Sequence, residues 1–130
     1  VKRKLSNIAI EHGLDILILF GSRASKKNKK NSDYDIAFLK KDISTTQEIN
    51  LFDDLIGLIE YEKIDLINIS KNHDAKLRNE IFQKGIPVYE KVNSLFKILK
   101  GKAWIDYQDF KRYSKNHSKI LKRSVEKLEI

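Results

Sequence analysis

Apolar residues recur along the chain with two different spacings, which predict alternating helices and strands. Between residues 5 and 12 they lie three or four positions apart, as on one face of a helix, and Gly13 can end that helix. Six of the seven residues over 14–20 are apolar, which predicts a buried strand. A polar, lysine-rich loop follows, and a second strand is predicted over 34–39. The chain therefore begins as helix, strand, loop and strand.

A second helix is predicted where a capping signal precedes an apolar stripe. Ser44 or Thr45, followed three positions later by Gln47 or Glu48, has the pattern of a capping box at a helix start. Behind this signal, apolar residues with helical spacing are expected to face the core: Ile49, Phe52, Leu55, Ile56 and Ile59.

The middle of the chain continues the same alternation. A third strand is predicted over 63–69, where apolar and polar residues alternate. Asn72 can cap a helix that runs to Lys84 and ends at Gly85. A short strand at 87–89 is expected at a sheet edge, because its proline cannot donate a hydrogen bond to a neighbouring strand.

Beyond residue 91 the apolar spacing is helical only. One stripe covers 92–99, and Gly101 is expected to break the helix after it. The three aromatic residues Trp104, Tyr107 and Phe110 are expected to pack in the core or against a partner. A second stripe then follows a spacing of three and four residues to the end of the chain: Tyr107, Phe110, Ser114, His117, Leu121, Ser124 and Leu128.

This order of elements predicts an α/β (α+β) protein with a small mixed sheet of about four strands flanked by helices. A length of 130 residues suits one domain with a helical extension. We expect a domain over residues 1–90, followed by C-terminal helices over 91–130 that pack on it or on a partner.

The composition excludes several classes of protein. The chain has no cysteine, which rules out disulfides, cysteine-ligated metals and a thiol nucleophile. Its longest uninterrupted apolar run is the five residues 16–20, far short of a membrane span. No signal peptide is recognisable at the start. We therefore expect a soluble cytoplasmic protein with no membrane partner.

The net charge of +8 is unevenly distributed. Residues 1–30 carry 8 basic and 2 acidic side chains, and residues 91–130 carry 11 and 4. Residues 31–90 carry 7 basic and 12 acidic side chains, so the acidic middle has a net charge of −5. This pattern suits a cation site between surfaces that attract anionic partners, and the alternative is a lysine-rich solubilising surface.

The candidate chemistry lies at the beginning of the predicted strands. Asp33 and Asp35 are two positions apart, so on a strand they project to the same side. Two close carboxylates repel each other unless a proton or cation lies between them, and magnesium (Mg²⁺) favours carboxylate and phosphate oxygens. Asp65, on a neighbouring strand, would complete a three-carboxylate cluster of the kind used in phosphoryl transfer. The alternative is that Asp65 is a solvated strand residue.

A phosphate site is predicted ten residues before this acidic pair. Gly21 follows a strand end and lets the backbone approach a phosphate closely. The hydroxyl of Ser22 and the backbone N–H groups after it can hold triphosphate oxygens. Arg23 and the lysine-rich patch 26–30 add positive charge nearby. A phosphate-binding loop next to metal-binding carboxylates is typical of enzymes that transfer nucleotidyl groups.

These residues resemble the minimal nucleotidyltransferase (MNT) family of the DNA polymerase β-like superfamily. The matching segments are LFGSRASKKNKKNSDYDIAFL at 19–39, EKIDLINIS at 62–70 and IFQKGIPVYE at 81–90. The resemblance implies a nucleotidyltransferase domain over 1–90, with Gly21, Ser22 and Arg23 binding the nucleotide. It further implies that Asp33, Asp35 and Asp65 are the catalytic residues and the metal ligands. Many relatives have a second glycine in the loop where this chain has Ser25 and lysines.

The ten-residue spacer resembles that of MNT antitoxins paired with HEPN toxins. The resemblance implies a magnesium-dependent transfer of AMP from ATP to a tyrosine hydroxyl on a HEPN toxin that the chain binds as its antitoxin. The two proteins would then form a hetero-oligomer. The alternatives are an antitoxin that acts by binding alone and a small-molecule nucleotidyltransferase. Nucleic acid is not expected as a direct ligand, because no groove-reading motif is present.

Arg112 and His117 resemble the arginine–histidine pair of HEPN ribonucleases in their spacing alone. Five residues along a helix correspond to a rotation of about 140°, so the two side chains diverge. We therefore expect His117 to be a packing or interface residue.

Overall fold

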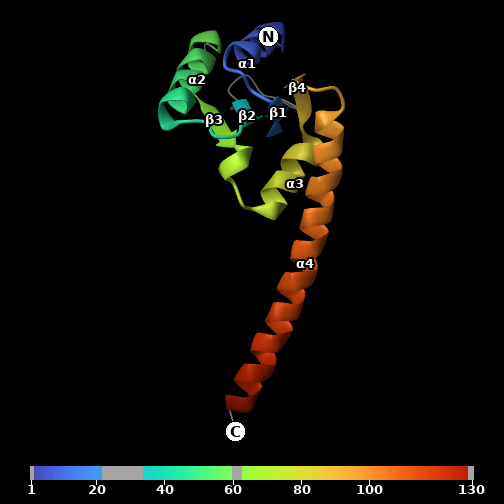
Figure 1. Ribbon diagram of the computed structural model, residues 1–130. Coiled ribbons are helices and arrows are strands. Elements are labelled where there is room, and N and C mark those ends of the chain that lie inside the picture. The colour runs from blue at the N-terminus through green and yellow to red at the C-terminus, as the bar shows by residue number, and fades with distance from the viewer. Residues whose placement is uncertain (1, 22–33, 60–62, 129–130) are drawn as a thin grey trace.

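The computed structural model describes residues 2–21, 34–59 and 63–128, and shows a sheet with helices on both faces and one long helix that extends beyond it (Figure 1). The order of the elements is the predicted one. They are α1 (Lys2–Glu11), β1 (Ile16–Phe20), β2 (Tyr34–Leu39), α2 (Thr45–Leu58), β3 (Ile64–Asn68), the 3-10 turn η2 (Ile69–Lys71), α3 (Ala75–Lys84), β4 (Ile86–Glu90) and α4 (Leu95–Leu128).

The four strands form a mixed sheet in the order β3-β2-β1-β4. β1 is antiparallel to both β2 and β4, whereas β2 and β3 are parallel and are joined through α2. A parallel pair needs such a crossover connection, since its strands start at the same edge of the sheet. The predicted fold class is confirmed, and the proline of β4 lies on an edge strand as expected.

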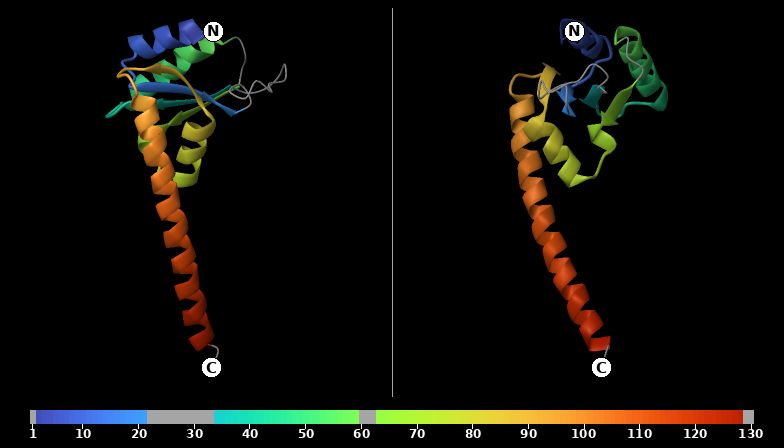
Figure 2. Two further views of the ribbon diagram at one scale, coloured as in Figure 1. Left: turned by 90° about the vertical axis from the view of Figure 1, so that its right-hand side faces the viewer. Right: turned by 180° about the vertical axis from the view of Figure 1, so that it is seen from behind.

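Each face of the sheet buries its own core because successive strand residues point to opposite sides. Leu17, Ile36 and Phe38 are buried on the face that α1 and α2 cover. Ile18 and Ala37 are buried on the other face, against α3 and the beginning of α4. Figure 2 shows these two helical layers on either side of the sheet.

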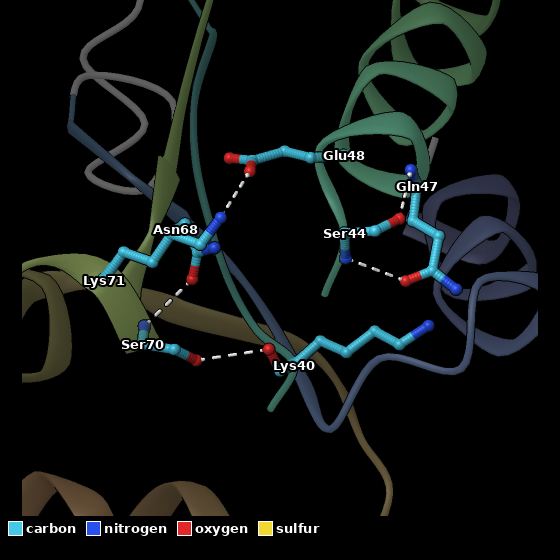
Figure 3. Close-up of polar contacts among 7 residues, drawn as sticks. All are labelled: Lys40, Ser44, Gln47, Glu48, Asn68, Ser70 and Lys71. Atoms are coloured by element: carbon cyan, nitrogen blue, oxygen red, sulfur yellow. Dashed lines mark hydrogen bonds and ion pairs between the residues drawn. The ribbon is translucent and has the colours of Figure 1, made fainter. Parts of the chain in front are cut away.

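The start of α2 is fixed by the predicted capping box. The Ser44 hydroxyl accepts a hydrogen bond from the Gln47 backbone N–H at 3.1 Å, and the Gln47 side chain accepts one from the Ser44 N–H at 3.0 Å (Figure 3). Glu48, in the first turn, forms an ion pair with Lys71 at 3.5 Å and so links α2 to η2. The buried side of α2 is made by Leu51 and Leu55, however.

The predicted inward stripe of α2 is therefore wrong in part. Ile49 is 55% exposed and Ile56 is 38% exposed. The physical reason is that α2 lies over the edge strand β3, so the sheet covers only part of the apolar surface of the helix. A helix with apolar residues on more than one side does not reveal from its sequence which side is buried.

The turn after β3 is held by side chains. The Asn68 side-chain oxygen Oδ1 accepts a hydrogen bond from the Ser70 N–H at 3.0 Å, and the Ser70 hydroxyl donates to the Lys40 backbone carbonyl at 3.4 Å (Figure 3). The predicted cap at Asn72 is wrong, because Asp74 caps α3 by accepting from two backbone N–H groups. Asn72 instead accepts a hydrogen bond from the Asp74 N–H at 2.8 Å.

The C-terminal region is one helix of 34 residues, so the predicted break at Gly101 is wrong. A glycine weakens a helix by about 1 kcal/mol relative to alanine but keeps its backbone hydrogen bonds, so the flanking helix continues through it. The helix starts where the Glu90 carboxylate accepts hydrogen bonds from the N–H groups of Ser94 and Phe96, at 3.1 and 3.0 Å. Within the described residues, no helix combines the length and the apolar character needed to cross a membrane.

Candidate active site

Three strands present their ends at one edge of the sheet. β2 and β3 are parallel, so the residues that begin them lie side by side. β1 is antiparallel to β2, so Phe20 at the end of β1 is paired with Asp35 near the start of β2. The connections around this edge therefore bring the predicted glycine and two of the predicted carboxylates into one place.

Asp35 and Asp65 are direct partners in the parallel register of β2 and β3. Paired residues on neighbouring strands project from the same face of the sheet, here the face that α3 and α4 cover farther along, as Ala37 shows. Asp35 is half-buried, whereas Asp65 is exposed on the edge strand. The fold therefore joins two carboxylates that are thirty residues apart in sequence.

Gly21 is packed against the Asp35 side chain. Its φ of +73° lies in the left-handed region that favours glycine. A Cβ atom built at this position would collide with the Asp35 carboxylate oxygen Oδ2. Two independent constraints therefore favour glycine at this position: the left-handed backbone conformation and the closeness of the Asp35 carboxylate.

The remaining predicted site residues, Ser22, Arg23 and Asp33, and the patch 26–30 lie outside the described residues. The roles expected for them stay predictions. Within the ranges 2–21, 34–59 and 63–128, no group of three or more His, Cys, Asp or Glu is placed to hold a metal ion. Two carboxylates on adjacent strands offer the hard oxygen ligands that magnesium prefers, so the donor chemistry of the described pair fits this ion.

A shallow hollow of about 400 Å³ lies beside Asp65, and sequence reasoning did not find it. Ile49 and Phe52 of α2 form its apolar side, together with Ile64 and Leu66 of β3, and Glu48 lies at its rim. The hollow therefore opens on the α2 side of β3, whereas the Asp65 side chain projects to the other face of the sheet. The sequence could not predict this hollow, because the hollow exists only where the tertiary structure leaves β3 at the edge of the sheet.

Two histidines take structural positions away from this edge. The His12 ring nitrogen Nε2 lies 2.6 Å from an oxygen of Asp54 and so connects α1 with α2. His117 stacks on Tyr113 in the exposed half of α4, with the ring centroids 5.7 Å apart. Arg112 lies 3.5 Å from Asp109 instead of turning toward His117.

Comparison with known proteins identifies the family. The family described as "Polymerase beta, Nucleotidyltransferase" matches residues 3–94. A search of curated protein sequences gives no match.

Solved structures share the fold over nearly the whole chain. A toxin–antitoxin structure with AMP-PNP is similar with a TM-score of 0.77 and 19% identity, over 92% of this chain and 97% of that one. A complex of the tri-AMPylated Shewanella oneidensis HEPN toxin with an MNT antitoxin is similar with a TM-score of 0.66 and 17% identity, over 93% of this chain and 98% of that one. A toxin–antitoxin structure of MntA and HepT is similar with a TM-score of 0.70 and 18% identity, over 92% of this chain and 95% of that one. The family match covers the sheet and the candidate site, and the chain therefore belongs to the polymerase beta nucleotidyltransferase family.

Proposed function

We propose that this chain is a magnesium-dependent adenylyltransferase that modifies and neutralises a HEPN-type toxin. The observation that carries this proposal is the pairing of Asp35 with Asp65 beside Gly21, at the edge where the nucleotidyltransferase strands end. Support also comes from structures of the same fold, one with AMP-PNP and one with a tri-AMPylated HEPN toxin. ATP is then the donor substrate, which would place the activity in the cytoplasm.

The proposed roles follow from the position of each residue. Asp33, Asp35 and Asp65 would hold magnesium, which would neutralise charge on the triphosphate when bound. Gly21 lets the chain turn tightly beside Asp35, toward the predicted triphosphate contacts Ser22 and Arg23.

Asp65 is placed to meet the acceptor hydroxyl, because its side chain is exposed on the edge strand β3. In the transfer, an acceptor hydroxyl oxygen forms a bond to the α-phosphorus of ATP, and the bond to the leaving pyrophosphate breaks. The hydroxyl proton moves to Asp65 as the general base. The hydroxyl is proposed to belong to a tyrosine of the toxin, which would reach Asp65 from the face of the sheet that α3 and α4 cover.

Transfer can be measured with a HEPN-type toxin, sought first in the reading frame adjacent to the one that encodes this chain. The purified proteins are incubated with ATP and magnesium chloride, and intact-protein mass spectrometry follows the addition of AMP to the toxin. We expect Asp35→Asn to abolish transfer and Asp65→Asn to lower its rate about a hundredfold or more, because a general base acts mainly in the transition state. Asp53→Asn, on the exposed side of α2, is the matched control and should retain the wild-type rate.

The same experiment separates the alternatives. Equal rates for Asp35→Asn and Asp53→Asn would contradict the assigned site. If the toxin is neutralised without gaining AMP, and equally well by Asp35→Asn, the chain is an antitoxin that acts by binding alone. Modification of a small molecule but not of the toxin would indicate a small-molecule transferase.

A further inference from the structure

The four-stranded sheet with α1, α2 and α3 is called the body below. The face of α4 that packs on this body continues past it without a partner among the described residues. Ala103 is buried against the α3 side of the sheet. Phe110 and His117 follow Ala103 at intervals of seven residues, so all three lie along one side of the helix. Figures 1 and 2 show that the second half of α4 projects away from the sheet and its helices in every view.

This second half carries a stripe of large apolar side chains in water. Every side chain from Asp109 to Glu126 is exposed. The residues of the stripe, called the α4 stripe below, are Phe110 (49% exposed), Tyr113 (68%), Ile120 (60%), Leu121 (52%) and Val125 (52%). A helix of this length has little stability of its own in water, and burial of such a stripe is what normally stabilises it.

The rest of this helix surface is basic. Between Asp109 and Glu126 there are six lysine or arginine residues and two acidic ones. Lys111, Lys115 and Lys122 lie within about 40° of one another at 100° per residue, on the side that adjoins Val125. Two copies of this chain paired through the stripe would bring these lysines together, which is unfavourable. The charge therefore favours a partner with acidic residues beside its apolar surface.

The spacing of the stripe favours a helical partner over a lipid surface. Phe110 and Leu121 belong to a row of positions, 110, 114, 117, 121 and 124, that recur at intervals of four and three residues, as in helix–helix seams. Polar residues lie within the seam at Ser114, His117 and Ser124. A helix lying in a lipid interface would instead be expected to have an uninterrupted apolar face.

The position of α4 also suits the proposed transfer. Asp35 and Asp65 project from the face of the sheet that carries α3 and α4. α4 extends away from the sheet on this same side (Figure 2). A partner lying along α4 is thus held on the side of the sheet from which the carboxylates are reached.

We propose that the α4 stripe is the docking surface for an amphipathic helix of the toxin, with apolar residues flanked by acidic ones. This inference rests on the proposed function, because it takes the AMP acceptor as the partner. Docking along α4 holds the toxin while its hydroxyl group reaches Asp65.

The test uses the full chain and the HEPN-type toxin that the transfer assay identifies as its acceptor. Leu121→Glu places a carboxylate in the stripe, and Asn116→Glu places one on another side of the same exposed helix segment. Neither residue is buried, so both variants keep the fold. Calorimetry should show that Leu121→Glu weakens toxin binding about tenfold or more, whereas Asn116→Glu changes it less than about twofold. Both variants should bind AMP-PNP with magnesium as the wild type does.

Rate measurements then separate this inference from the proposed function. At saturating toxin concentration Leu121→Glu should still transfer AMP, with a raised KM for the toxin, while Asp35→Asn should bind the toxin without transfer. Equal toxin affinity for Leu121→Glu and Asn116→Glu would overturn the docking surface even if wild-type transfer is intact. No transfer by the wild type would overturn the proposed function instead.

Two further measurements test the other occupants. Sedimentation of the chain alone should give a monomer, and a dimer abolished by Leu121→Glu would show that a second copy covers the stripe. Flotation with phosphatidylglycerol vesicles should recover no protein, and vesicle binding abolished by Leu121→Glu would assign the stripe to lipid. Either result overturns the inference.

Discussion

Gly21 and Asp35 lie at the ends of neighbouring antiparallel strands, and the space between them leaves no room for a Cβ atom. The sequence indicated that a glycine after a strand lets the backbone approach a phosphate. The structure adds that the same glycine leaves room for a carboxylate. Asp65 reaches this place through strand register alone, because its local sequence is equally typical of a solvated strand residue.

We expect Gly21→Ala to damage the site. The positive φ costs an alanine about 1–2 kcal/mol, and its methyl group displaces the Asp35 carboxylate. Calorimetry with AMP-PNP and magnesium chloride should show affinity reduced about tenfold or more. Gly57→Ala is the matched control, because nothing lies within 4 Å of the added Cβ at this helical position. Wild-type affinity in Gly21→Ala would show that the Asp35 carboxylate has no role in nucleotide binding.

Helices α2 and α4 show what local sequence reveals about an element and what it leaves open. The capping box of α2 was predictable, because Ser44 and Gln47 interact within one turn. The length of α4 was not, because a single glycine lowers helix stability by an amount that the neighbouring turns offset.

We expect Gly101→Ala to stabilise α4 by up to about 1 kcal/mol, because alanine loses less backbone entropy and finds open space. Urea unfolding followed by circular dichroism should show a higher midpoint. Gly85→Ala should have the opposite effect, since its Cβ would collide with the Ile81 carbonyl oxygen and the Ile18 side chain. A lower midpoint for Gly101→Ala would indicate that the helix needs to bend or open at this position.

The whole molecule consists of a packed body and a helix segment that leaves it. In the first half of α4, Phe96 lies against Phe82 of α3 with ring centroids 5.5 Å apart, and the Lys100 backbone carbonyl accepts a hydrogen bond from the Gln83 side-chain amide at 3.1 Å. Beyond Asp109 the described side chains are all exposed. Of the aromatic residues expected to pack, Trp104 is 53% exposed and Phe110 is 49% exposed.

Hydrogen exchange of the chain alone should therefore divide α4 in two. We expect the amides of 99–107 to be protected together with α3, and those of 111–126 to exchange faster by about tenfold or more, because only tertiary packing stabilises a helix strongly. Mass spectrometry of the peptic fragments measures both segments. Addition of the toxin should protect 111–126. Equal protection in the isolated chain would mean that the distal helix is already covered.

The sequence by itself determined the features that depend on near neighbours along the chain. These are the order of helices and strands, the capping box of α2, the edge position of the proline strand, and the glycine and aspartates that identified the nucleotidyltransferase family. Each follows from backbone hydrogen bonding or side-chain spacing within a few residues.

Only the tertiary structure decided the features that depend on distant segments. The register of β2 and β3 brought Asp65 beside Asp35, and the open side of β3 left Ile49 at a hollow instead of in the core. The size of the body decided where α4 stops being covered. The physical reason is that apolar periodicity predicts that one face of a helix or strand will be buried, but not which segment will cover it. For the α4 stripe, the proposed docking assigns that burial to a helix of the toxin.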